Sequence, residues 1–443
     1  MSNEQKPKTR DSFTNRLGFI MACIGSAVGM ANVWAFPYRT AMYGGAAYLI
    51  PYLICVVFLW RTGTISETAF GRWAKTGPHG AMKKALTENN KPFKHMGIIP
   101  VISSFAIATG YAVIMGWVIR YLVGAITGAV VHTESVGDYF GAICGPLGSV
   151  PWHVAALVVT VLMMVGGISK SVEKINKVMI PLFFVLFVIM AAYVVTLPGS
   201  GTGYNYLFVP RWEFLAQPRT WVFALGQAFF SLSLAGNGTV IYGSYLGRDV
   251  DAVSSARNIA IFDTVAALLA ACVVIPAIFA FGMDPASGPP LMFITLPAIF
   301  QSMGSFGYIF SIIFFLAIFS AAASSIVNLY ETPIEMVQET FKLPRKAAVA
   351  IIIISSGLIG LILENADYIG TWMDVMSIYL CPLGALLAAY CFYWVLSKKT
   401  AIEEMSLARS TPVSDFIYNL GKYAYCLVAI VVIVLGIALG GIG

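Results

Sequence analysis

Charged residues are scarce in this chain of 443 residues. Asp, Glu, Lys and Arg make up 11% of the sequence, whereas hydrophobic residues make up 58%, and the mean hydropathy is +0.81. Soluble domains carry about 25% charged residues, so this composition excludes an ordinary water-soluble protein. The chain is predicted to lie within a lipid bilayer.

Residue patterns of common enzymes are also missing. The sequence contains no HExxH, GxSxG or P-loop motif and no CxxC pair among its seven cysteines, and its four histidines lie in or beside predicted loops without ligand spacing. We therefore predict no enzyme activity, no disulfide and no organic cofactor. The net charge of +6 comes from basic loops, so it favours anionic lipid and not nucleic acid as a partner.

Hydrophobic runs long enough to cross a bilayer recur along almost the whole sequence. A helix needs about 20 apolar residues to span a hydrocarbon core of about 30 Å. Lipid offers the backbone no hydrogen-bond partners and barrel-strand patterns are absent, so the spans should be helices. The predicted fold class is all-α and polytopic, with about eleven spans. They are expected at 16–41, 44–71, 98–127, 152–167, 176–197, 219–246, 258–282, 305–338, 347–363, 367–396 and 416–440.

Basic residues concentrate in every second predicted loop. Short loops rich in Lys and Arg stay on the cytoplasmic side of a membrane. With an odd number of spans, the N-terminal tail 1–15 is then cytoplasmic and the C-terminus extracellular or periplasmic, in an inner (plasma) membrane. The basic loops lie at 72–94, 170–177, 248–257, 342–346 and 398–409.

Two spans contain glycine and polar residues that an unbroken helix in lipid would avoid. Small residues can also allow close helix packing. The two clusters, however, lie five spans apart, as equivalent elements of a five-plus-five inverted repeat would. We predict one transporter domain, 1–443, with repeats at 16–197 and 219–396 and an additional helix at 416–440. The clusters read Gly25-Ser-Ala-Val-Gly-Met-Ala-Asn32 and Gly226-Gln-Ala-Phe-Phe-Ser-Leu-Ser-Leu-Ala-Gly-Asn-Gly-Thr239.

Motifs around these breaks resemble the bacterial branch of the neurotransmitter:sodium symporter family, which includes leucine- and tryptophan-transporting members. The resemblance covers essentially the whole chain and implies a LeuT-like fold with discontinuous first and sixth helices. In order, the motifs are Arg16-Leu-Gly-Phe19, Gly25-Ser-Ala-Val-Gly29, Asn32-Val-Trp-Ala-Phe-Pro-Tyr38, Gly44-Gly45, Ile50-Pro-Tyr52, Glu67 with Gly71-Arg72, Gly226-Gln227, Ser231-Leu-Ser233-Leu234 and Thr295-Leu-Pro-Ala-Ile-Phe300.

The resemblance implies two sodium sites. The first would comprise the carbonyl of Ala27, the side chains of Asn32, Ser231 and Asp263, and a carboxylate oxygen of the substrate. An acid within the membrane, such as Asp263, is costly unless it faces a cation. A protonated, hydrogen-bonded Asp263 in the core is the alternative.

The second sodium site would use the carbonyls of Gly25 and Val28 together with oxygens from the eighth span. That span aligns in two ways. Alignment on residues 342–346 gives Ala321, Ser324 and Ser325, and alignment on the preceding phenylalanines gives Ser320, Ala323 and Ser324. We favour the first set because it retains the hydroxyl groups that sodium needs.

For a substrate, the resemblance places a carboxylate against the N–H groups of Met30 and Ala31 and the Tyr111 hydroxyl. Gly236 stands where relatives have a bulky apolar residue, and Asn237 and Asn328 add polarity, so the pocket is expected to be roomier or more polar than a leucine site. The implied substrate-binding residues are Ala27, Met30, Ala31, Tyr111, Phe230, Ser231, Ser233 and Gly236.

Two gates are implied as well. At the outer gate, Ala35 replaces an arginine found in many members, and Arg39, one turn further on, is predicted to reach Asp374. At the inner gate, Arg10 and Phe13 match basic and aromatic family residues, with Glu339 as the acidic partner. Arg61, in the second span, has no family counterpart and either pairs with an acid of a neighbouring helix or snorkels outward.

These observations predict a sodium-coupled symporter that imports an amino acid or a related small zwitterion or amine. Two Na⁺ ions are expected, without chloride, because Asp263 supplies the negative charge near the first site. The main alternative is a proton-coupled transporter of the same fold in which Asp263 titrates. A sensor or channel with this fold is a further alternative. The sequence does not specify an oligomeric state.

Overall fold

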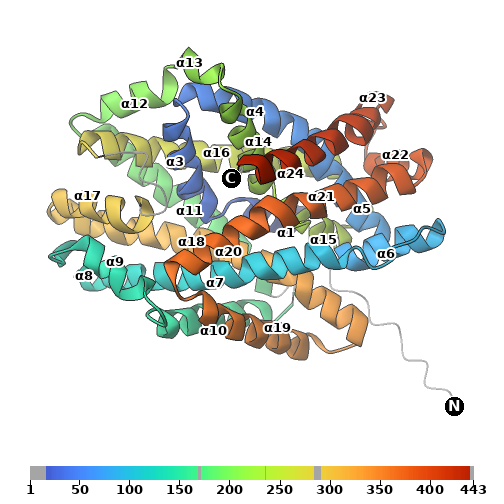
Figure 1. Cartoon of the computed structure of the whole chain (residues 1–443), viewed down its shortest axis with the longest axis horizontal. Helices are drawn as coiled ribbons and strands as arrows, with labels where there is room; N and C mark the ends of the chain where they lie inside the picture. The colour runs from blue at the N-terminus through green and yellow to red at the C-terminus, as the bar shows by residue number, and fades with distance from the viewer. Residues whose placement is uncertain (1–15, 168–170, 235, 284–290, 440–443) are drawn as a thin grey trace.

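A computed structural model describes residues 16–167, 171–234, 236–283 and 291–439. Regular structure in these residues is helical and includes no strand, which confirms the predicted all-α class. The long helices lie side by side, with α1 (Arg16–Ala27) and α15 (Gly238–Ser244) near the centre of the view in Figure 1.

In the described part of the chain, eight helical segments are long and apolar enough to cross a membrane. Several consist of helices joined end to end through a π-helical or 3-10 turn. Four segments are Ala46–Ala74 (α4 Ala46–Leu59, η1 Trp60–Thr64, α5 Ile65–Ala74), α7 (Ile98–Thr127), α11 (Glu173–Val195) and α16 (Ala252–Ala280). The others are α18 (Ser305–Phe341), Arg345–Leu363 (α19 Arg345–Gly360, η4 Leu361–Leu363), Tyr368–Val395 (within α20 Ala366–Val375, η5 Met376–Leu380, α21 Cys381–Tyr390, η6 Cys391–Val395) and Asp415–Leu439 (α23 Asp415–Asn419, η7 Leu420–Tyr425, α24 Cys426–Leu439).

The first predicted span is a ninth candidate, but it is bent. Its two parts, Leu17–Ala27 and Met30–Met42, meet at 56°, and the second part consists of α2 (Met30–Val33) and α3 (Ala35–Met42). Two further predicted spans are shorter in the structure, α10 (Val150–Met164) and the pair α14 (Pro218–Ser231) and α15. The count of eleven spans and the inverted repeat therefore stay predictions.

Short helices occupy the connections between these segments. One of them, α17, includes most of the predicted family motif that begins at Thr295. They are α6 (Pro78–Glu88), α8 (Ala129–His132), α9 (Val136–Cys144), α12 (Ser200–Phe208), α13 (Trp212–Leu215), η3 (Leu291–Thr295), α17 (Leu296–Ser302) and α22 (Lys398–Ser406).

Large apolar side chains are exposed on the outer helices. Leu162 on α10, Leu358 on α19 and Leu427 on α24 are 70%, 64% and 61% exposed. Water would penalise this surface, whereas lipid does not. The interior is closely packed around α7 and α18, where Ser104 donates a 2.8 Å hydrogen bond to the carbonyl of Leu329.

Both predicted helix breaks are present. Residues 28 and 29 separate α1 from α2, with Gly29 in an extended conformation. Between α14 and α15 the backbone takes positive φ values at Ser233 (57°), Gly236 (103°) and Asn237 (55°). Glycine and asparagine adopt positive φ readily, whereas serine does so rarely. The conformation of Ser233 is therefore the one that contacts must hold.

Candidate functional site

The two breaks contact each other directly. The hydroxyl of Ser233 donates a 2.7 Å hydrogen bond to the carbonyl of Ser26, and the Ser26 hydroxyl lies 3.2 Å from that of Ser233. Residues some 200 positions apart thus bring the ends of four short helices to one place. Helix ends leave N–H and C=O groups without intrahelical partners, so this point offers polar backbone in a largely apolar core.

Asp263 connects α16 to both broken spans. Its Oδ1 accepts a 2.8 Å hydrogen bond from Nδ2 of Asn32, and its Oδ2 accepts a 2.6 Å hydrogen bond from the hydroxyl of Ser231. All three side chains are buried. These donors are neutral, and neutral donors orient a carboxylate without balancing its charge. The three side chains predicted for the first sodium site therefore lie together. Ala27, the fourth predicted residue, is the last residue of α1.

The eighth predicted span presents a second group of oxygen atoms to the first break. The Ser325 hydroxyl lies 3.2 Å from the carbonyl oxygen of Val28 and 3.4 Å from that of Gly25. Ser324 is adjacent, because a Cβ on Gly25 would lie 3.2 Å from its Cβ, and its hydroxyl bonds the carbonyl of Ala321. These residues form the favoured set for the second sodium site.

The alternative alignment of the eighth span does not give such a group. Ser320 is buried, but its hydroxyl donates to the carbonyl of Leu316 within its own helix. That alignment would also leave out Ser325, the side chain that meets the two carbonyl groups of the break. The geometry thus agrees with the first alignment, although ion binding itself stays a prediction.

The start of α2 is also occupied by polar contacts. The backbone N–H of Met30 donates a 2.9 Å hydrogen bond to the hydroxyl of Tyr111, as the predicted carboxylate site requires these groups to be neighbours. The N–H of Gly29 donates to Oδ1 of Asn32 at 3.0 Å. Asn32 therefore holds both the N-terminus of α2 and, through its Nδ2, the carboxylate of Asp263.

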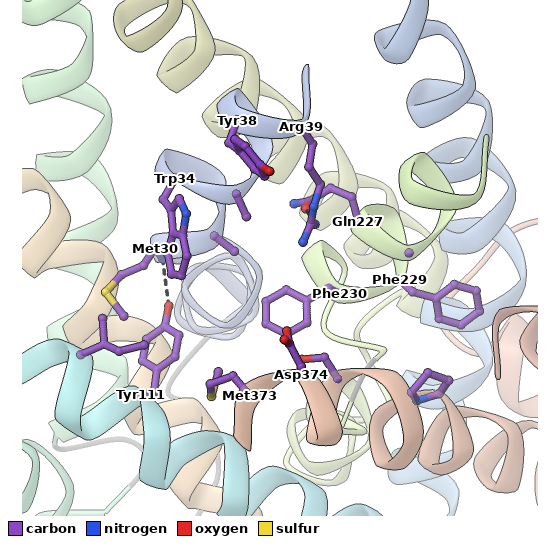
Figure 2. A pocket seen from close by; sticks show the side chains of 16 residues that line it. Met30, Trp34, Tyr38, Arg39, Tyr111, Gln227, Phe229, Phe230, Met373 and Asp374 are labelled. Atoms are coloured by element: carbon purple, nitrogen blue, oxygen red, sulfur yellow. Dashed lines mark hydrogen bonds between the residues drawn. The ribbon is translucent and has the colours of Figure 1, made fainter. Parts of the chain in front are cut away.

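Two cavities meet at this point. The larger cavity, of about 280 Å³, has Phe230, Trp34, Tyr38, Arg39 and Asp374 in its wall, and Figure 2 shows these side chains. The smaller cavity, of about 50 Å³, lies against Ser26, Ser233 and Gly236. Three residues border both cavities, namely Ala31, Tyr111 and Phe230. These three predicted substrate residues therefore line the boundary between the two cavities.

The predicted gates are resolved only in part. Arg39 hydrogen-bonds to the side chain of Gln227, a partner that the sequence did not predict, while Asp374 lies across the larger cavity (Figure 2). The predicted Arg39–Asp374 contact is therefore not the one formed here. Glu339 accepts a hydrogen bond from Thr76, and its predicted partners Arg10 and Phe13 lie outside the described residues.

Two buried polar neighbours of the helix breaks were not predicted as site residues. Glu67, noted only within a motif, is buried and accepts hydrogen bonds from Asn237 (2.9 Å) and Thr239 at the second break. Asn176 of α11 points its Oδ1 at Gly25, because a Cβ there would lie 1.9 Å from this oxygen. Their presence within predicted membrane spans was the sequence signal that could have identified them, because acids and amides are rare there.

Arg61 lies on the outside of its span, exposed, with its guanidinium 5.3 Å from the ring centroid of Trp60. This position agrees with an outward-reaching side chain, one of the two expectations for this residue.

The chain resembles known transporters over nearly its full length. A sequence model described as the sodium:neurotransmitter symporter family matches residues 10–144 and 142–439. The chain belongs to this family. An uncharacterized sodium-dependent transporter of Bacillus subtilis (strain 168), YhdH, is 31% identical over 418 residues, covering 91% of each chain. One from Methanocaldococcus jannaschii is 29% identical, covering 87% of this chain and 82% of the relative.

A solved structure confirms the fold of this family member. The crystal structure of MhsT in complex with L-phenylalanine superposes with a TM-score of 0.87 at 32% identity, covering 96% of this chain and 99% of MhsT. The symporter described here therefore has the LeuT-like fold. It is a multi-pass membrane protein that couples transport to sodium, and its family consists of transporters and not of enzymes.

Proposed function

We propose that this symporter imports an amino acid or a related small zwitterion by alternating access, together with two Na⁺ ions and without chloride. One observation carries the proposal: two buried clusters of oxygen atoms lie close to the place where the two cavities meet. The group around Asp263 and the group around Ser325 both adjoin the break between α1 and α2. A zwitterion can use both kinds of helix end, its carboxylate facing N–H groups and its ammonium facing carbonyl groups.

Both oxygen groups have the chemistry that sodium requires. Hard cations take about six oxygen ligands from carboxylates, carbonyls and hydroxyls. Asp263 supplies the single carboxylate of the first group, and the second group consists of neutral oxygens of Gly25, Val28, Ala321, Ser324 and Ser325. A substrate carboxylate beside Ala27 and Asn32 would complete the first group, which makes sodium binding and substrate binding favour each other.

The cavities support a route for the substrate. Solute and sodium would enter through the larger cavity and pass Phe230 to the smaller one. They would leave at the opposite, predicted cytoplasmic side once the broken helices move against the other spans. The sodium gradient would supply the work, since one charge moved through 100 mV is worth about 2.3 kcal/mol.

Uptake by the purified protein in liposomes tests this proposal. We expect accumulation of at least one amino acid when sodium is outside, and none when choline replaces sodium. Equal uptake in choline, with or without a proton gradient, would contradict sodium coupling of amino acid transport.

Proton coupling is the second candidate, because the described contacts of Asp263 are with neutral donors and a protonated carboxyl would also fit there. In that case accumulation in choline should follow an imposed pH gradient and collapse with a protonophore. Indifference of sodium-driven uptake to the protonophore would exclude it.

A further inference from the structure

The smaller cavity is lined by polar side chains whose hydrogen-bonding groups are mostly in use. Ser26 and Ser233 bond each other, and Ser104 donates to the carbonyl of Leu329. Ser325 is taken up by the carbonyls of the first break. None of these hydroxyl groups needs a ligand to complete its hydrogen bonding.

Asn328 differs from these residues. It lines the same cavity and is 2% exposed, and its Oδ1 is the one buried side-chain oxygen among the described cavity residues that has no hydrogen-bond partner. Its Nδ2 lies 3.4 Å from the carbonyl oxygen of Ala22. Because a carbonyl can only accept, this contact fixes which end of the amide is Nδ2 and leaves the acceptor end free.

A buried acceptor without a donor is costly, so native proteins rarely keep one without a reason. Gly236, across the cavity, has open space where a side chain would begin, since a Cβ there would still be 4.0 Å from Ser104. Its φ of 103° disfavours any larger residue. The space beside Gly236 therefore stays open because the backbone conformation of the second break favours glycine at this position.

We infer that Asn328 selects the substrate side chain: the symporter prefers neutral amino acids whose short side chain ends in a hydrogen-bond donor, a hydroxyl or a carboxamide. This inference rests on the proposed amino acid transport. The substrate's donor completes the hydrogen bonding of Oδ1, and a volume of about 50 Å³ suits a side chain of a few atoms. An apolar side chain of the same size leaves Oδ1 unpaired and is disfavoured.

Threonine and valine form the matched pair for the test, because they have nearly the same shape and differ by a hydroxyl in place of a methyl group. We expect threonine to bind at least about tenfold more tightly than valine in sodium, measured by competition with a radiolabelled substrate. Serine should likewise bind more tightly than alanine. Equal affinities within both pairs, with sodium-dependent binding intact, would overturn the inference and leave the proposed function standing.

The variant Asn328→Leu removes the acceptor at similar size. It should bring the threonine-to-valine affinity ratio close to one, mainly by weakening threonine binding, because threonine loses the acceptor for its hydroxyl group. A ratio unchanged from wild type would assign the preference to another residue and overturn the role of Asn328. The wild-type pairs carry the test if the variant does not fold. If no amino acid binds in sodium, the proposed function fails and the inference fails with it.

Discussion

The side-chain amide of Asn32 donates a 2.8 Å hydrogen bond to Oδ1 of Asp263, which joins the first helix break to α16. Ser231 holds the other carboxylate oxygen at 2.6 Å, from the last turn of α14. One buried acid thus lies between the two broken spans. Because its described partners are neutral, a bound cation at this point would be attracted by a full negative charge.

Asp263→Asn should therefore weaken sodium binding. The variant keeps the size of the side chain and removes its charge, so we expect the sodium concentration for half-maximal uptake to rise at least about tenfold, equivalent to 1.4 kcal/mol. Sodium activation curves in liposomes measure this. Asp249→Asn, the same change at an exposed loop position, is the control and should behave as wild type. An unaltered curve for Asp263→Asn would remove this residue from the sodium site.

Two serines of α18 distinguish the alternative alignments of the second sodium site. Ser325 faces the carbonyls of Gly25 and Val28, whereas Ser320 bonds its own helix. We expect Ser325→Ala to raise the half-maximal sodium concentration at least about tenfold, since a hydrogen bond or ligand to a charged group is worth about 1.5–3 kcal/mol and 1.4 kcal/mol is a factor of ten. Ser320→Ala is the matched control with little effect. The reverse ranking would favour the other alignment.

Chloride should not be required for uptake. The predicted first site already contains the carboxylate of Asp263, so no additional anion is needed to balance a sodium ion there. Replacing chloride with gluconate on both sides of the liposome should leave the initial uptake rate unchanged. Loss of uptake in gluconate that chloride restores would contradict this prediction. Asp263→Asn offers a second check, because chloride should support uptake by the variant better than gluconate does.

Arg39 is expected to exchange its partner when the larger cavity closes. It bonds Gln227 here and faces Asp374 across the cavity, and approach of the opposite charges would favour closure. Arg39→Ala and Asp374→Ala should each slow transport, and the double variant should be less impaired than the product of the two effects, with a coupling of about 1 kcal/mol. If the effects of the two substitutions on transport are independent, the two residues do not interact during closure. Arg219→Ala, which removes an arginine at an exposed position of α14, is the control.

Glu67 should stabilise the second break. Glu67→Ala leaves Asn237 and Thr239 without their buried acceptor, and an unsatisfied buried group costs about 1–3 kcal/mol. We expect a lower midpoint of thermal unfolding in detergent than for wild type. Glu88→Ala, at an exposed position of α6, should leave the midpoint unchanged. Equal midpoints for both variants would show that the carboxyl group does not support the break.

Hydropathy and glycine placement were sufficient to predict the helical class and both broken spans, because lipid imposes length and backbone satisfaction on each segment separately. Family motifs predicted that Asn32, Ser231 and Asp263 would come together. The pairing of Arg39 with Gln227 and the free acceptor of Asn328 were not predictable in this way. They depend on which faces of distant helices pack together and on side-chain reach, and a linear pattern specifies neither.

The hydroxyl of Tyr111 accepts a hydrogen bond from the N–H of Met30, so it competes with a substrate carboxylate for that N–H. A substrate carboxylate that takes the amide must displace a hydroxyl already bonded at 2.9 Å, so the hydrogen bond formed at this N–H replaces one that the empty protein already makes. Discrimination at this position is then against ligands that bind only through a carboxylate. Affinity must then come from the ammonium group, the side chain and the bound sodium ions together. This favours solutes that carry both an ammonium group and a side chain that fits the pocket.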